Sequence, residues 1–156
     1  MRKADVAPDL SSIAFNFFFW FSRFECALKE GGYLKSHVVG SKAEPGWEEF
    51  IQKWHAEYEC SMEAKVLLNA RPERQMVGHG SNLTWQAVDL SNCKTELAQV
   101  VRLLQTVRNN LFHGGKSGGA GWDNPERTRL LLSNGLLLLN QLCEMAGMEA
   151  DYQQFY

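Results

Sequence analysis

The sequence predicts an all-α fold, built as a single bundle of four to five helices. Apolar residues recur at helical spacing along most of the chain, and glycine and proline stand where such helices would begin or end. No series of strands that would form a parallel sheet is visible. The 156 residues are 45% hydrophobic and 22% charged, which is typical of one globular domain. No linker or repeat divides residues 1–156.

The first helix is expected from Ser11 to Glu30, because Gly31 and Gly32 would end it. Its main apolar stripe consists of Ile13, Phe17, Trp20, Phe21, Phe24 and Leu28. Further aromatic residues lie off this stripe, at Phe15, Phe18 and Phe19. A helix that is apolar on more than one face is usually buried on more than one face. We therefore expect one face to meet the core and another to meet a second subunit.

Three more helices follow in the predicted order. The second spans Pro45 to Ala70, and the third runs from Ser91 to about His113. The fourth begins with the strong helix start at Asn124–Glu126 and ends at Gly147. Residues 71–90 are predicted to be irregular, since their strand signal, "LTWQAV", is short.

Composition narrows the classes of function. The formal net charge is −2, so no overall basic field attracts nucleic acid, and any RNA binding must come from a local patch or an assembled cleft. The four cysteines form no Cys-x-x-Cys pair, which predicts buried free thiols in a reducing compartment and no metal site or cofactor. The apolar run near the start is too short to span a membrane and lacks a cleavage site. We expect a cytoplasmic protein without membrane contact.

The stretch "VRNNLFHGGKSGG", residues 107–119, suggests two different kinds of site. Its "GGKS" resembles the end of a phosphate-binding P-loop. A P-loop, however, needs a glycine five residues before Gly115 and a strand in front of it, and the sequence has Asn110 and a helix. We therefore interpret "GGKS" as a helix stop and a loop, in which Lys116 could still contact a phosphate as a point charge.

The other half of the stretch, "RNNLFH", places a charge among core positions. On an ideal helix Arg108 falls within the stripe of Leu97, Val101, Leu104 and Leu111. Such an arginine either extends from the edge of the core into water or faces an anion in a cleft between subunits. His113 lies five residues later, about 140° around an ideal helix. A shared site therefore requires a helix that ends at the histidine, a symmetric partner subunit, or both.

At this point the sequence resembles the HEPN family. "RNNLFH" is similar to the Arg-x(4–6)-His motif of HEPN domains, in which a polar residue usually follows the arginine. "FSRFECALKEGGYL" resembles the first helix of some small bacterial HEPN proteins. The resemblance implies a homodimer formed through the motif-bearing face, and an endoribonuclease that acts without metal. Such proteins are commonly toxins or antiphage defence effectors, so an antitoxin or defence partner protein is a further expectation.

The resemblance assigns catalysis to Arg108, Asn109 and His113. Histidine is suited to proton transfer near neutrality, and the guanidinium fork of arginine is suited to a phosphate. In the proposed reaction a ribose 2′-OH attacks the adjacent phosphorus, which restricts the substrate to RNA. Asn110 and Lys116 are candidates for supporting contacts with the RNA.

The first helix also carries polar candidates for the site, namely Arg23, Glu25 and Lys29. Glu25 and Lys29 are four residues apart and could form a simple surface pair. Alternatively, Glu25 pairs with Arg108 or Arg23 at the cleft. Two other functions stay open at this stage: a non-catalytic HEPN module that binds RNA, a nucleotide or a partner protein, and a purely structural helical dimer.

Overall fold

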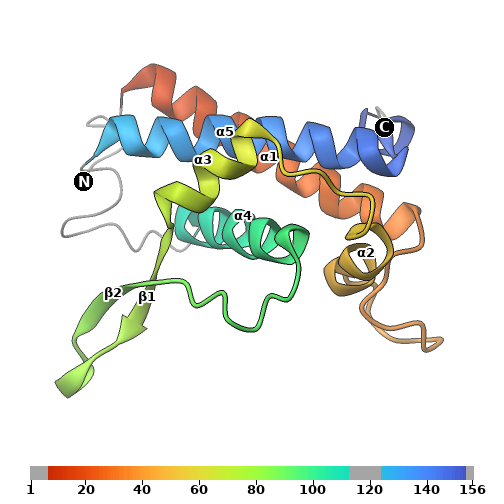
Figure 1. Ribbon diagram of the computed structural model, residues 1–156, viewed down its shortest axis with the longest axis horizontal. Coiled ribbons are helices and arrows are strands. Elements are labelled where there is room, and N and C mark those ends of the chain that lie inside the picture. Colours follow the sequence, from red (N-terminus) through yellow and green to blue (C-terminus); the bar gives the residue numbers. More distant parts are fainter. Residues whose placement is uncertain (1–6, 113–123, 154–156) are drawn as a thin grey trace.

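Two long helices lie side by side and organise the molecule (Figure 1). The computed structural model describes residues 7–112 and 124–153. The two long helices are α1 (Pro8–Glu30) and α5 (Pro125–Ala146). The shorter helices are α2 (Trp47–Trp54), α3 (Met62–Ala70), α4 (Glu96–Phe112) and α6 (Glu149–Gln153). The expectation of a mostly helical protein is confirmed.

The helices α1 and α5 run in the same direction and approach closely near their middles. Near their starts, Arg129 donates to Asp9 over 2.6 Å. Further along, Phe17 is fully buried opposite Gly135, where an added Cβ would lie 2.7 Å from the ring. Glycine at this position therefore sets the distance between the two helices.

Aromatic side chains from α1 and α2 form the centre of the core. Phe21, Phe24 and Phe50 are almost fully buried. Trp47 stacks on Phe24 with 5.1 Å between ring centroids, and its ring is tilted against Phe21 at 5.6 Å. Offset and tilted ring pairs stabilise a core beyond the area they bury. This cluster fixes α2 against α1, close to the candidate site.

The predicted C-terminal ends of both long helices and the predicted start of α5 are confirmed, whereas α1 begins at Pro8 instead of Ser11. Gly31 donates its backbone N–H to Ala27 and ends α1. The Asn124 side chain accepts the N–H of Arg127 at 2.9 Å and caps the start of α5. Gly147 adopts the left-handed conformation, with φ of 64°, directly after α5.

The prediction of one helix from Pro45 to Ala70 is wrong. The segment forms α2 and α3, separated by residues 55–61. Ser61 caps the start of α3, because its side chain accepts the N–H of Ala64 at 3.2 Å. The break lets α2 pack on α4 while α3 packs on both α4 and α5. The third predicted helix begins at Glu96 instead of Ser91, after Thr95 accepts the N–H of Ala98.

The fold is not purely all-α, so this part of the predicted fold class is corrected. Strands β1 (Glu73–Val77) and β2 (Leu83–Ala87) form an antiparallel hairpin that projects from the helices (Figure 1). The short strand signal "LTWQAV" therefore marked a real strand. Its partner, "ERQMV", lacks apolar alternation, because most of the hairpin faces water and is not selected for burial. The described part contains six α-helices where four to five were expected.

Two further expectations concern cysteines and membranes. No disulfide joins the four cysteines, all of which lie in the described ranges, but only Cys143 is buried. Burial raises the pKa of the Cys143 thiol to about 12. Within residues 7–112 and 124–153, no helix has the length and apolar character needed to cross a membrane.

We predict that Gly135→Ala destabilises the protein by about 1–3 kcal/mol, because the new methyl overpacks the contact with Phe17. Glycine to alanine in an open helix position would instead stabilise by up to about 1 kcal/mol. The free energy of unfolding, measured by urea denaturation, should therefore fall if Gly135 packs tightly against α1 and rise if Gly135 faces open space.

Asn134→Ala, at the neighbouring position of α5, is the matched control. The Asn134 side chain donates to the Leu130 carbonyl of its own helix. The substitution should change the stability by less than about 0.5 kcal/mol. A Gly135→Ala variant more stable than the wild type would contradict the packing of α1 on α5.

Candidate functional site

Arg108 lies in the second-last turn of α4, where its guanidinium packs between two aromatic rings. Its Cζ is 5.5 Å from the ring centroid of Phe21 and 5.0 Å from that of Phe112. The side chain is 34% exposed, and its Nη2 lies 3.6 Å from Oε2 of Glu25. A partly buried cation is stabilised by such rings and by a nearby carboxylate. The arginine is thus held in place while part of it still faces water.

The carboxylate of Glu25 connects three helices. Its Oε1 accepts the indole N–H of Trp47 at 3.2 Å, and its other oxygen faces Arg108. Arg108 also donates from Nη1 to Oδ1 of Asn109 at 3.0 Å. Of the alternatives from the sequence, the structure has Glu25 paired with Arg108. Trp47, Glu25, Arg108 and Asn109 form a continuous polar chain, which we call the Glu25 relay.

Asn110 has a different position from its neighbour Asn109. Its Nδ2 donates to the backbone carbonyl of Glu73 at 2.6 Å. This bond ties α4 to the first residue of β1. The amide that the sequence offered as an RNA contact thus anchors the base of the hairpin.

Arg23 and Lys29 lie on α1 but do not join the Glu25 relay. Arg23 donates from Nε to the carbonyl of Tyr152 at 3.1 Å and also to that of Asp151, so it holds α6 against α1. Lys29 lies in the last turn of α1, where a positive charge is favoured by the helix dipole. Of the three polar candidates on α1, the structure brings only Glu25 to Arg108.

Two of the candidate residues, His113 and Lys116, lie outside the described residues. Their position relative to Arg108 therefore stays a prediction. The described part of α4 reaches Phe112, directly before the histidine in the sequence.

Sequence reasoning missed the role of Trp47. Trp47 is a core residue, only 8% exposed. A buried indole still needs an acceptor for its N–H, and this requirement was the available signal. The acceptor proves to be Glu25, which links the core of α2 to Arg108.

An exposed aromatic surface adjoins Arg108. Phe18 of α1 packs edge-on against Phe112 of α4, with 4.9 Å between centroids, and Phe15 stacks on Phe19 at 6.5 Å. These four rings, which we call the aromatic patch, are between 37% and 65% exposed. A run of exposed aromatic residues is uncommon on a monomer and is typical of an interface. The off-stripe residues of α1 therefore lie largely on the surface of the described chain.

No described cluster has the make-up of a metal site, since no three His, Cys, Asp or Glu side chains gather within residues 7–112 and 124–153. The Glu25 relay consists of one guanidinium, one carboxylate, one indole N–H donor and one amide oxygen that accepts from the guanidinium. This set is suited to binding an anion near the guanidinium.

Comparisons with protein-family models, with curated proteins and with solved structures found no match for this chain.

We predict that Trp47 and Glu25 are energetically coupled. Trp47→Phe and Glu25→Gln should each reduce the stability, and a double-mutant cycle should give a coupling of about 0.5–1.5 kcal/mol, the range of a typical intramolecular hydrogen bond. The measurement is urea denaturation of the wild type, the two single variants and the double variant.

Trp54→Phe is the matched control, because it removes an indole N–H that donates to the Tyr33 hydroxyl over 2.9 Å, elsewhere on α2. Its cycle with Glu25→Gln should show no coupling beyond about 0.3 kcal/mol. Equal coupling in both cycles would show that the Trp47 effect comes from general loosening of α2.

Proposed function

We propose that this protein is a homodimeric, metal-independent endoribonuclease of the HEPN type, with Arg108, Asn109 and His113 as its catalytic residues. The observation that carries the proposal is the setting of Arg108. Its charge is retained at the edge of an aromatic core, partly exposed and paired loosely with Glu25. It stands in "RNNLFH", and Asn109 directly contacts it.

In the proposed reaction the ribose 2′-oxygen attacks the adjacent phosphorus. A base takes the 2′-OH proton as the O2′–P bond forms, and the P–O5′ bond breaks as an acid protonates O5′. The products are a 2′,3′-cyclic phosphate and a free 5′-hydroxyl. His113 supplies the proton transfers, and in a dimer the two copies of His113 can divide the roles of base and acid.

Arg108 would stabilise the charge that develops on the phosphate. The guanidinium presents several N–H donors in one plane, and its contacts with Glu25 and Asn109 do not use all of them. The 3.6 Å separation from Glu25 is longer than a strong charged hydrogen bond. A substrate phosphate can therefore compete for the arginine at low cost, while Glu25 keeps it oriented.

A dimer through the aromatic patch is the second part of the proposal. The patch adjoins Arg108 directly, because Phe112 contacts both Arg108 and Phe18. A second copy packed on this face by a two-fold axis would place two motifs beside one cleft. The biological role that follows from the resemblance is that of a cytoplasmic toxin or antiphage defence effector controlled by a partner protein.

We predict that the wild type cleaves RNA in the presence of EDTA and that Arg108→Ala and His113→Ala lower the rate by at least about a hundredfold, the usual contribution of an acid–base or charge-stabilising group. The assay is single-turnover cleavage of a labelled RNA, with analysis of the product ends for a 2′,3′-cyclic phosphate.

Two residues outside the site, the exposed His55 and the half-buried Arg129, supply the control variants, and His55→Ala and Arg129→Ala should cleave like the wild type. A substrate with a single 2′-deoxy residue at the cut site should resist cleavage. Cleavage that is equal in the wild type, Arg108→Ala and His113→Ala would contradict the proposal. RNA binding without any cleavage would favour the non-catalytic HEPN module instead.

We also predict that Phe15→Glu converts a dimer into a monomer, because it places a charge in the centre of an apolar interface. Sedimentation velocity at micromolar concentration should show a dimer for the wild type. The variant should fold normally, as Phe15 is 65% exposed.

Val77→Glu is the matched control, since Val77 is 77% exposed and lies on the hairpin, outside the aromatic patch. It should leave the dimer intact. A monomeric wild type, or equal loss of the dimer in both variants, would count against this interface.

A further inference from the structure

A groove of about 780 Å³ lies between α2 and α4, and Trp47 is among the residues that line it. Its size is within the range of cavities that hold small ligands. One wall is the start of α2 with the segment that precedes it, from Leu34 to Gly46, and the other is the first half of α4. The aliphatic floor includes Ile51 and Val101.

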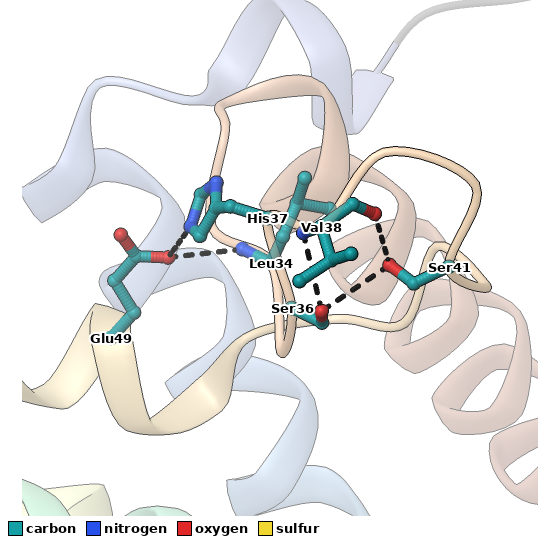
Figure 2. A network of polar contacts seen from close by, with 6 residues as sticks. All are labelled: Leu34, Ser36, His37, Val38, Ser41 and Glu49. Atoms are coloured by element: carbon teal, nitrogen blue, oxygen red, sulfur yellow. Dashed lines mark hydrogen bonds and ion pairs between the residues drawn. The ribbon is translucent and has the colours of Figure 1, made fainter.

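The wall in front of α2 is held by a compact polar network (Figure 2). Oε2 of Glu49 accepts the backbone N–H of Leu34 at 3.0 Å and lies 3.1 Å from Nε2 of His37. The hydroxyl of Ser41 in turn donates to the carbonyl of Val38 at 2.7 Å. These contacts engage Glu49 within the wall and give the groove a fixed edge before any ligand arrives.

The α4 wall carries a cation, Arg102, that has no side-chain partner in the described part of the chain. Among the described residues, the guanidinium of Arg102 forms no ion pair or hydrogen bond. The other lysine or arginine of the lining, Lys35, pairs with Glu44 at 3.5 Å. Glu48, on the opposite wall, is exposed and also lacks an ion pair in the described part. The groove thus presents one available cation on α4 and one available carboxylate on α2.

The groove is aligned with the candidate site. Val101 and Arg102 line it, and Arg108 and Asn109 follow seven residues later, on the same helix face and about 10 Å further along the axis. Trp47 belongs to both places, because it lines the groove and donates to Glu25, which faces Arg108. A strand bound at Arg108 and extended along α4 therefore enters the groove.

We propose that the groove between α2 and α4 binds the single-stranded RNA that continues from the scissile phosphate, with Arg102 contacting a backbone phosphate. This inference rests on the proposed ribonuclease function. The phosphate lies on the α4 side, where the available guanidinium is. The base faces α2, where Glu48 accepts a hydrogen bond from an exocyclic amino group and Gln52 offers an amide.

The test compares RNA lengths. The full-length His113→Ala protein is titrated with a labelled dinucleotide and with a single strand of about ten nucleotides, a length within the range that single-strand sites occupy. Arg102→Ala should weaken binding of the long strand by about tenfold, the usual effect of losing one charged hydrogen bond, and leave the dinucleotide unchanged. The slope of log K against log salt for the long strand should fall by about 0.7.

Lys65→Ala is the matched control, because Lys65 is an exposed cation on α3 and its loss changes the net charge equally. It should change neither affinity. Equal weakening by Lys65→Ala and Arg102→Ala, or equal weakening of both RNA lengths, would overturn the inference. Binding of a free mononucleotide that depends on Arg102, without any gain from strand length, would also overturn the assignment to an RNA strand.

Cleavage by the active protein separates this inference from the proposed function. Arg102→Ala should raise the KM for the long RNA and leave cleavage of the dinucleotide unchanged. If the wild type cleaves both the long RNA and the dinucleotide but Arg102→Ala has no effect, the proposed RNA groove is wrong and the proposed ribonuclease function is retained. If no RNA is cleaved but the affinity for the long strand still depends on Arg102, the proposed reaction is wrong and the proposed RNA groove is retained. A groove that takes a protein partner instead would show Arg102-independent RNA binding.

Discussion

The carboxylate of Glu25 is the constraint that joins the core to the surface of this protein. A guanidinium packed among aromatic rings needs a nearby negative charge, and Glu25 supplies it for Arg108. The same carboxylate gives the buried indole of Trp47 its acceptor. A single side chain thus links helices α1, α2 and α4, and each would leave a polar group unpaired if it moved away.

The amphipathic division of α1 makes this arrangement possible. One face supplies Phe17, Phe21 and Phe24 to the core, where Gly135 admits α5 to close distance. Another face leaves the aromatic patch exposed beside Arg108. A helix that served only to fill a core would not need apolar side chains on both faces. This surplus is the physical basis for proposing a second copy at the patch.

The sequence predicted the long helices well, because glycine, proline and asparagine caps act locally at Gly31, Asn124 and Gly147. It failed between Pro45 and Ala70, where a continuous apolar pattern concealed a break that only the packing of α2 and α3 explains. The hairpin was underestimated, since exposed strands leave little alternation to detect. Arg108 could be chosen from its place on an apolar stripe. The hydrogen bond from Trp47 to Glu25, and the contact of Arg23 with α6 instead of with the site, depend on tertiary geometry.

The most direct measurement of the central claim is an NMR titration of the arginine side chains with a 2′-deoxy dinucleotide, which carries the phosphate but cannot be cleaved. We predict a saturable shift of the Arg108 Nε–H signal, with the Arg129 signal unchanged because Arg129 pairs with Asp9 at the start of α1. An unperturbed Arg108, under conditions in which the dinucleotide binds elsewhere on the protein, would contradict it.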